Sequence, residues 1–132
     1  MGEFTELEDP KLDLLIREHL NRIVGTILSR FSPFSIVLRG SFGRGEGSVL
    51  PVENGYHFLS DYEIDVITNR PFYRKALSEL THQLSKELQV ETGLRWNRED
   101  SLLHRRMGPF PVGAAEKTIS LYEFRCGSRI LW

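Results

Sequence analysis

Four glycines lie within eight consecutive positions directly after an apolar run, and this tract limits the possible folds more than any other segment of the chain. Residues 36–38 are suited to a buried strand. The tract that follows, residues 40–47, contains Gly40, Gly43, Gly45 and Gly47. Glycine loses more conformational freedom on folding than other residues, so four of them together need a reason. The sequence therefore predicts a loop that exposes its backbone at the tip of a core strand.

The charge of the whole chain does not favour binding to a polyanion. Its 132 residues, enough for a single domain, include 17 lysines and arginines against 18 acidic residues, a net charge of −1. No global positive field attracts this protein to a long nucleic acid or a membrane surface. Any anion site must come from a local arrangement of donors.

Composition also bears on the compartment and on the extent of the domain. One cysteine, Cys126, excludes an internal disulfide and favours a reducing environment. No apolar run approaches the roughly 20 residues of a membrane span, and the acidic N-terminus is unlike a signal peptide. We therefore expect a cytoplasmic protein. The apolar ending SRILW suggests that residues 1–132 are a single domain at the N-terminal end of a longer protein.

Periodicity predicts an α/β (α+β) domain. Residues 11–31 have the three-and-four spacing of an amphipathic helix, with Asp9 as N-cap, Pro10 at the first position and a stop at residues 32–33. A second helix is expected to open near Pro71. Strands are predicted over residues 34–39, 61–68, 89–96, 118–124 and 129–132. The glycine tract is predicted to continue as a loop over residues 50–58, with turns at Pro51 and at residues 54–55. Residues 97–117 are expected to be irregular.

The strand predicted over residues 61–68 alternates acidic with apolar side chains. Asp61, Glu63 and Asp65 therefore share one face, because residues two apart in a strand point the same way. Carboxylates this close repel one another unless a cation lies among them. Their hard oxygen atoms suit Mg²⁺ or Mn²⁺. A solvated outer face of an edge strand explains the same pattern without a metal.

The glycine tract has the composition of a phosphate-binding loop. Backbone N–H groups at Gly40 and Gly43 can approach phosphate oxygens closely, Ser41 adds a hydroxyl donor, and Arg44 or Arg39 adds charge. A phosphate loop on one strand and paired carboxylates on the next match what a nucleoside triphosphate with Mg²⁺ requires.

The segment LRGSFGRGEG…SDYEIDVI resembles the motif of the DNA polymerase β-like nucleotidyltransferase superfamily. That resemblance covers residues 36–67. It implies a mixed sheet with helices packed on it, contact of Gly40 and Ser41 with the triphosphate, and two metal ions held by Asp61, Glu63 and a third carboxylate. The implied reaction transfers a nucleoside monophosphate to a hydroxyl acceptor and releases pyrophosphate.

The match leaves two choices open, namely which carboxylates form the metal-binding pair and which residue is the third carboxylate. The 19 residues between Ser41 and Asp61 exceed the usual spacer, and the acidic Asp65 permits a rival pairing of Glu63 with Asp65. For the third carboxylate, also implied to be catalytic, Glu91 has the expected order in the chain and Glu123 is the rival.

From the sequence we thus expect a Mg²⁺-dependent nucleotidyltransferase whose partners are an NTP and an unidentified acceptor. The alternative is a non-catalytic nucleotide-binding module with the same fold.

Overall fold

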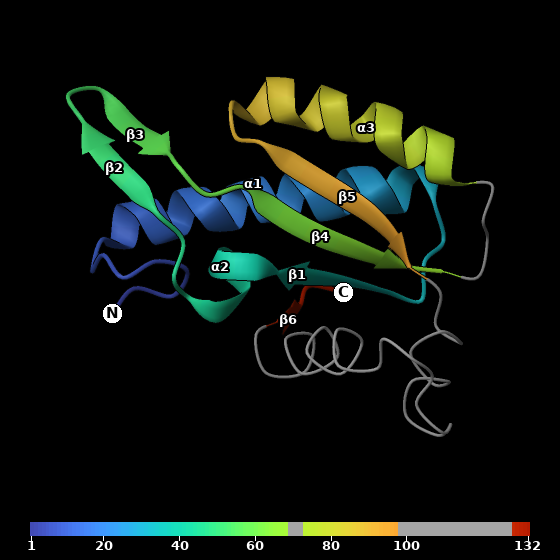
Figure 1. The fold of residues 1–132 in the computed structure, drawn as a ribbon, viewed down its shortest axis with the longest axis horizontal. Helices are drawn as coiled ribbons and strands as arrows, with labels where there is room; N and C mark the ends of the chain where they lie inside the picture. The colour runs from blue at the N-terminus through green and yellow to red at the C-terminus, as the bar shows by residue number, and fades with distance from the viewer. Residues whose placement is uncertain (69–72, 98–127) are drawn as a thin grey trace, which may run out of the picture.

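The computed structural model describes residues 1–68, 73–97 and 128–132 (Figure 1). The helices are α1 (Pro10–Arg30), α2 (Gly40–Arg44) and α3 (Tyr73–Leu88). The strands are β1 (Ser35–Arg39), β2 (Val49–Val52), β3 (Gly55–Phe58), β4 (Tyr62–Ile67), β5 (Thr92–Asn97) and β6 (Arg129–Ile130). This is an α+β fold with a mixed sheet, which confirms the predicted fold class.

The main sheet has the strand order β5-β4-β1-β6. Strand β1 pairs antiparallel with β4, and the register places Arg39 opposite Glu63. Strand β4 pairs parallel with β5, with Asp65 opposite Arg95. A parallel pair needs a long crossover connection, and α3 supplies it between β4 and β5. In Figure 1, α3 runs alongside β5.

One face of this sheet forms the hydrophobic core with α1 and α3. The inward strand residues alternate along the chain, as expected for strands with one face packed on helices. They are Ile36, Leu38, Tyr62, Ile64, Val66 and Leu94. Helix α1 contributes Leu12, Ile16, Leu20, Ile23 and Ile27, and α3 contributes Leu77, Leu80 and Leu84. The charged residues Arg39, Glu63, Asp65 and Arg95 therefore belong to the second face of the sheet.

The first helix begins and ends where the sequence predicts. The side chain of Asp9 accepts hydrogen bonds from the backbone N–H groups of Lys11 and Leu12, at 3.0 and 3.3 Å. Pro10 occupies the first turn, where its missing N–H costs nothing. Among the described residues, no helix has both the length and the apolar character needed to cross a bilayer.

The segment between β1 and β4 differs from the predicted loop. Residues 40–44 form the short helix α2, which ends at Gly45 in the left-handed conformation, φ 80°. Strands β2 and β3 then form a two-stranded hairpin, in which Pro51 pairs with Tyr56. A proline is tolerated there because β2 has a partner on one side only. The predicted strand 118–124 lies outside the described residues.

The outer edge of β5 is hydrogen-bonded by side chains of α3. The Ser85 hydroxyl accepts a hydrogen bond from the Thr92 N–H at 2.9 Å, and the Thr81 hydroxyl accepts one from the Leu94 N–H at 3.1 Å. Ser85 and Thr81 are four residues apart and therefore lie on one face of α3. The helix thus supplies the acceptors that a further strand would otherwise supply.

This arrangement predicts that Ser85→Ala is destabilising. Thr92 is buried, 1% exposed, so its N–H would lose its partner without access to water. The expected cost is about 1–3 kcal/mol, measured by chemical denaturation. Ser78→Ala, at an exposed position of the same helix, serves as control and should change stability by less than about 0.5 kcal/mol. Equal effects of the two substitutions would contradict this role of Ser85.

Candidate functional site

The end of β1 and the start of β4 meet at Gly40 and Glu63. Gly40 adopts φ +68°, a conformation that favours glycine. A Cβ atom at this position would overlap the carboxylate of Glu63. The glycine tract and the acidic strand, which the sequence predicts as separate features, are therefore in direct contact.

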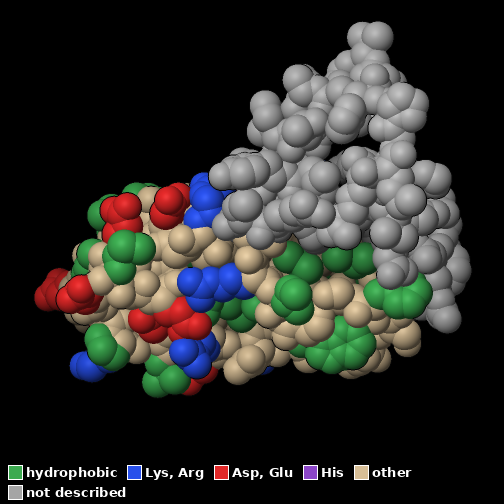
Figure 2. Space-filling model, turned by 90° about the horizontal axis from the view of Figure 1, so that it is seen from below, with side chains coloured by type: hydrophobic (Ala, Val, Ile, Leu, Met, Phe, Trp, Pro, Cys, Tyr) green, Lys and Arg blue, Asp and Glu red, His purple; other side chains and the backbone are tan. Residues whose placement is uncertain are grey.

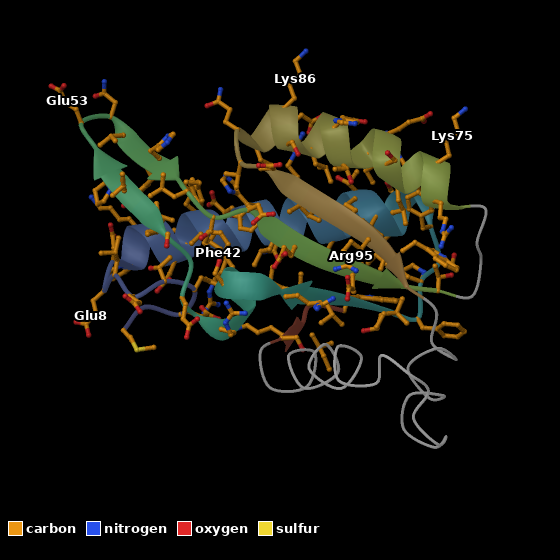
Figure 3. The ribbon with its side chains drawn as sticks, in the orientation of Figure 1. Glu8, Phe42, Glu53, Lys75, Lys86 and Arg95 are labelled. Atoms are coloured by element: carbon orange, nitrogen blue, oxygen red, sulfur yellow. The ribbon has the colours of Figure 1, made fainter. Side chains whose placement is uncertain are left out.

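The rest of the glycine tract is shaped by a buried aromatic ring. Phe42 is fully buried, and it points from α2 into the core (Figure 3). A Cβ atom at Gly47 would collide with this ring, so the chain must be glycine there to pass Phe42. Ser41 is partly exposed, and its hydroxyl has no hydrogen-bond partner within the described residues. That hydroxyl is available to a ligand.

The glycine tract is also held from outside by two distant segments. The Gly47 N–H donates to the Phe4 carbonyl at 2.9 Å. The Arg129 side chain donates from Nε to the Gly43 carbonyl at 3.3 Å and from a terminal nitrogen to the Glu3 carbonyl. The sequence analysis missed Arg129 and the N-terminal segment as supports of this loop. No local pattern indicates contacts that span 126 positions.

The three acids of the predicted row occupy different environments. Asp61 directly precedes β4, and both Asp61 and Glu63 are exposed. Neither carboxylate has an ion-pair partner in the part of the chain that the structure describes. Asp65 is only 1% exposed, and its Oδ2 lies 3.1 Å from Nη1 of Arg39. The Arg39 guanidinium therefore compensates the negative charge of Asp65, whereas the carboxylates of Asp61 and Glu63 remain accessible.

Glu91 lies beside Asp61 at the start of the parallel pair. The register joins Tyr62 to Thr92, so Asp61 and Glu91 each occupy the position before the first paired residue. The Tyr62 N–H donates to the Glu91 carbonyl at 2.8 Å, and the Glu91 side chain is exposed. No group of three or more His, Cys, Asp or Glu side chains within residues 1–68, 73–97 and 128–132 is gathered as a metal site. The rival Glu123 lies outside these residues.

Arg44, predicted to contact phosphate, is the last residue of α2. Its Nε lies 2.9 Å from an oxygen of Glu46, and both side chains are exposed. Exposed ion pairs contribute little to stability and are easily exchanged. Arg44 therefore lies within the predicted tract, but its ion pair with Glu46 does not orient its guanidinium toward Glu63. Gly43 is buried and is fixed through its carbonyl.

An aromatic cluster supports the site from the core side. Tyr62, between Asp61 and Glu63 in the chain, is fully buried, and the centre of its ring lies 4.9 Å from the centre of the Phe42 ring. Its hydroxyl lies 3.0 Å from Nδ1 of His19 on α1. Burial raises the pKa of Tyr62 and lowers the pKa of His19. The nearby Glu18 carboxylate acts in the opposite direction on His19, but its effect is smaller than that of burial. Both groups are therefore held neutral, and the hydrogen bond anchors the start of β4 to α1.

Comparison with known proteins finds no match: no family model, no curated protein and no solved structure matches this chain. Any assignment of function thus depends on the residues described above.

The contact at Gly40 predicts the effect of Gly40→Ala. A side chain at φ +68° costs about 1–2 kcal/mol, and the Glu63 carboxylate must move away to accommodate the methyl group. The melting temperature should therefore fall. Gly25→Ala is the matched control, because a Cβ atom at Gly25 has nothing within 4 Å. That change in the exposed interior of α1 should raise stability by about 0.5–1 kcal/mol. If Gly40→Ala raised the melting temperature as much as Gly25→Ala, this result would contradict the contact between Gly40 and Glu63.

The buried state of His19 predicts a loss of stability in acid. An unfolded histidine titrates near pH 6.5, and burial lowers the pKa of His19 in the folded state. The unfolded state thus binds more protons, so the contribution of neutral His19 is complete above about pH 6.5 and is lost as the pH falls below it. His19→Gln should reduce the fall in melting temperature between pH 7.5 and 5.5. His82→Gln, at an exposed position of α3, should leave that fall unchanged.

Proposed function

We propose that this chain is a Mg²⁺-dependent nucleotidyltransferase domain. It transfers a nucleoside monophosphate from an NTP to a hydroxyl acceptor and releases pyrophosphate. The observation that carries the proposal is the contact between Gly40 and Glu63, because it brings the glycine tract and an accessible carboxylate together in one place. The resemblance of residues 36–67 to the DNA polymerase β-like superfamily supports the same assignment.

The nucleotide is bound through the glycine tract. The absence of a side chain at Gly40 lets the Glu63 carboxylate lie against the backbone where the tract begins, and beside it the free hydroxyl of Ser41 donates to a phosphate oxygen. Arg44 exchanges its exposed partner Glu46 for the phosphate, and Gly43 keeps the loop anchored through Arg129. These donors neutralise part of the triphosphate charge locally, although the net charge of the whole chain is −1.

The free carboxylates suit magnesium. Mg²⁺ is usually held by one or two carboxylates together with phosphate oxygens and water, so Asp61 and Glu63 suffice as protein ligands once the NTP is present. A bound Mg²⁺ would stabilise the negative charge that develops on the phosphates. Glu91, next to Asp61 in the register, completes the proposed ligand set, and an oxygen of its carboxylate accepts the proton of the acceptor hydroxyl.

A long nucleic acid is not part of this proposal. On the face shown in Figure 2, basic and acidic side chains of the described residues lie beside each other. A polyanion requires a continuous positive surface, and its binding depends on several phosphate contacts at once. A hydroxyl group of a small molecule or of a protein is a better fit, as the acceptor, to this surface of mixed charge.

One observation favours a second candidate, a module that binds nucleotides without catalysis. Asp65 is engaged in an ion pair with Arg39, so two of the three acids of the predicted row, Asp61 and Glu63, are accessible. A binder needs no more than these, whereas catalysis also requires the proton acceptor Glu91. Release of pyrophosphate from an NTP separates the two candidates.

The test is a melting scan with each NTP, with and without Mg²⁺. A ligand that binds only the folded state raises the melting temperature. Asp61→Asn should abolish the Mg²⁺-NTP shift and leave the apo melting temperature unchanged or slightly higher, because like-charge repulsion is relieved. Ser41→Ala should weaken the shift by about 1–2 kcal/mol in binding free energy, with no change in apo stability.

Asp65→Asn is the control within the same row. This change leaves Arg39 facing a neutral group at a site that is almost fully buried, so apo stability should fall by up to about 3–5 kcal/mol. The remaining folded protein should still respond to Mg²⁺-NTP. If Asp65→Asn removed the response and Asp61→Asn did not, Glu63 would pair with Asp65 instead. No response from the unmodified protein to any NTP would refute the proposal.

A further inference from the structure

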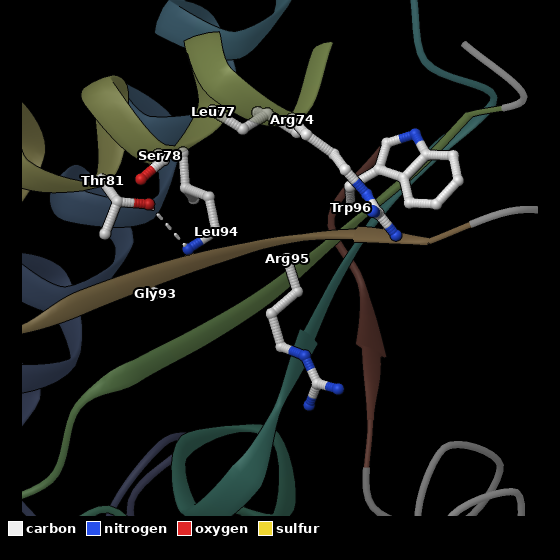
Figure 4. Close-up of a pocket in the computed structure, with 8 residues that line it drawn as sticks. All are labelled: Arg74, Leu77, Ser78, Thr81, Gly93, Leu94, Arg95 and Trp96. Atoms are coloured by element: carbon white, nitrogen blue, oxygen red, sulfur yellow. Dashed lines mark hydrogen bonds between the residues drawn. The ribbon is translucent and has the colours of Figure 1, made fainter. Parts of the chain in front are cut away.

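The second face of β5 has an open position between two charged side chains. From Val90 to Arg95, buried residues alternate with accessible ones. The accessible residues, Glu91, Gly93 and Arg95, therefore lie on the face of the sheet opposite α3. Figure 4 shows the Arg95 side chain pointing from β5 away from that helix. This face of the strand thus presents a carboxylate, a glycine and a guanidinium in turn.

Gly93 leaves space beside the carboxylate of Glu63. The two residues are register partners, so they lie next to each other on the second face. Gly93 is not among the glycines with positive φ. Among the described residues, a Cβ atom at Gly93 would have one neighbour within 4 Å, the Tyr62 carbonyl at 3.8 Å. Neither backbone conformation nor crowding requires a glycine here. A glycine inside a strand weakens the strand, and one use of such a position is the close approach of a ligand.

The positive charge of Arg95 has no compensating group. Arg95 is exposed, and it forms no hydrogen bond or ion pair in residues 1–68, 73–97 and 128–132. Its register partner Asp65 is 1% exposed and already accepts a hydrogen bond from Arg39 at 3.1 Å. The fork of guanidinium N–H groups matches the paired oxygen atoms of a carboxylate or a phosphate. Arg95 is therefore available to an oxyanion on the same face as Glu63.

The strand order places β5 across the carboxylates from the glycine tract. The tract follows β1, Glu63 belongs to β4, and the order is β5-β4-β1-β6. In the proposed function the triphosphate contacts the tract, and Glu91 accepts the proton of the acceptor hydroxyl. The place that remains for the body of the acceptor is then over β5.

We propose that Glu91, Gly93 and Arg95 form the acceptor site, and that the acceptor is a small hydroxyl compound with an oxyanionic group, a phosphate or a carboxylate. Its hydroxyl lies at Glu91, its body crosses the open position at Gly93, and its oxyanion binds Arg95. Four positions of a strand span roughly 13 Å, and both long side chains shorten this distance by turning toward Gly93. That the bound molecule is the acceptor rests on the proposed function; the binding of an oxyanion at Arg95 does not.

The experiment follows the NMR signals of the Gly93 amide and the Arg95 Nε–H in the metal-free protein with EDTA present. The probes are glucose 6-phosphate, glucuronate and glucose, which share one ring and differ at a single carbon, with chloride at equal ionic strength for comparison. The two anionic sugars should shift both signals, and glucose and chloride should not. In Arg95→Gln, binding measured at the Gly93 amide should weaken at least tenfold.

Gly93→Val tests the open position. A β-branched residue is favoured in a strand, and the space over Gly93 accommodates it, so the melting temperature should stay the same or rise. The added side chain should nevertheless block the anionic sugars, so their shifts at the Arg95 Nε–H should be lost. A position that serves only the structure would not gain stability and lose binding together.

Lys75→Gln is the matched control for charge, because Lys75 lies on α3 and points away from the sheet (Figure 3). It should leave the binding of both anionic sugars unchanged. An equal loss in Lys75→Gln, equal shifts with chloride, or full binding in Arg95→Gln or Gly93→Val would overturn the proposal, since each indicates a diffuse charge effect or a site elsewhere.

The response to nucleotide separates this inference from the proposed function. Arg95→Gln should keep the melting response to Mg²⁺-NTP, because the triphosphate contacts the tract on the other side of β4. A protein that binds the anionic sugars through Arg95 but responds to no NTP retains the oxyanion site and loses the nucleotidyltransferase assignment. A protein that responds to Mg²⁺-NTP but shows no shift at Gly93 or Arg95 with either anionic sugar overturns the inference alone.

Discussion

The antiparallel pairing of β1 with β4 determines where every candidate residue lies. Because Arg39 faces Glu63, the chain leaves β1 at the point where it enters β4, and the turn at Gly40 must pass directly over an acidic side chain. Only a residue without a side chain does so at φ +68°. The hairpin β2–β3 fills the distance between the two strands along the sequence without altering this pairing. The long spacer between Ser41 and Asp61 is therefore compatible with close contact of the two motifs.

Alternate side chains of β4 point to the two faces of the sheet, and the two faces have different roles. Tyr62 and Ile64 are fully buried among α1 and α3, and they fix the strand in position. Glu63 points to the second face and remains accessible. Asp65 also belongs to the second face but is bonded to Arg39, so it contributes to structure there. Neighbouring acids of one short strand thus have different roles because their surroundings differ.

Local patterns predict much of this arrangement. The cap at Asp9, the strand ending at Arg39 and the alternation after Asp61 depend on neighbours in the chain, and the structure contains all three. The sequence does not reveal that Arg39 pairs with Asp65, since that contact joins two strands 26 residues apart. It also predicts a loop at residues 40–44, where a short helix forms once Phe42 is buried. Such features arise from packing, which periodicity does not encode.

The hydroxyls of Ser85 and Thr81 have a consequence for association between molecules. An outer strand normally presents unpaired N–H groups that another chain can use to extend the sheet. Here the outward N–H groups of Thr92 and Leu94 are already bonded to α3. A strand from a second molecule could add at this edge only after α3 had moved away and exposed Leu80 and Leu84 to water. The helix therefore protects the parallel edge of the sheet from aggregation.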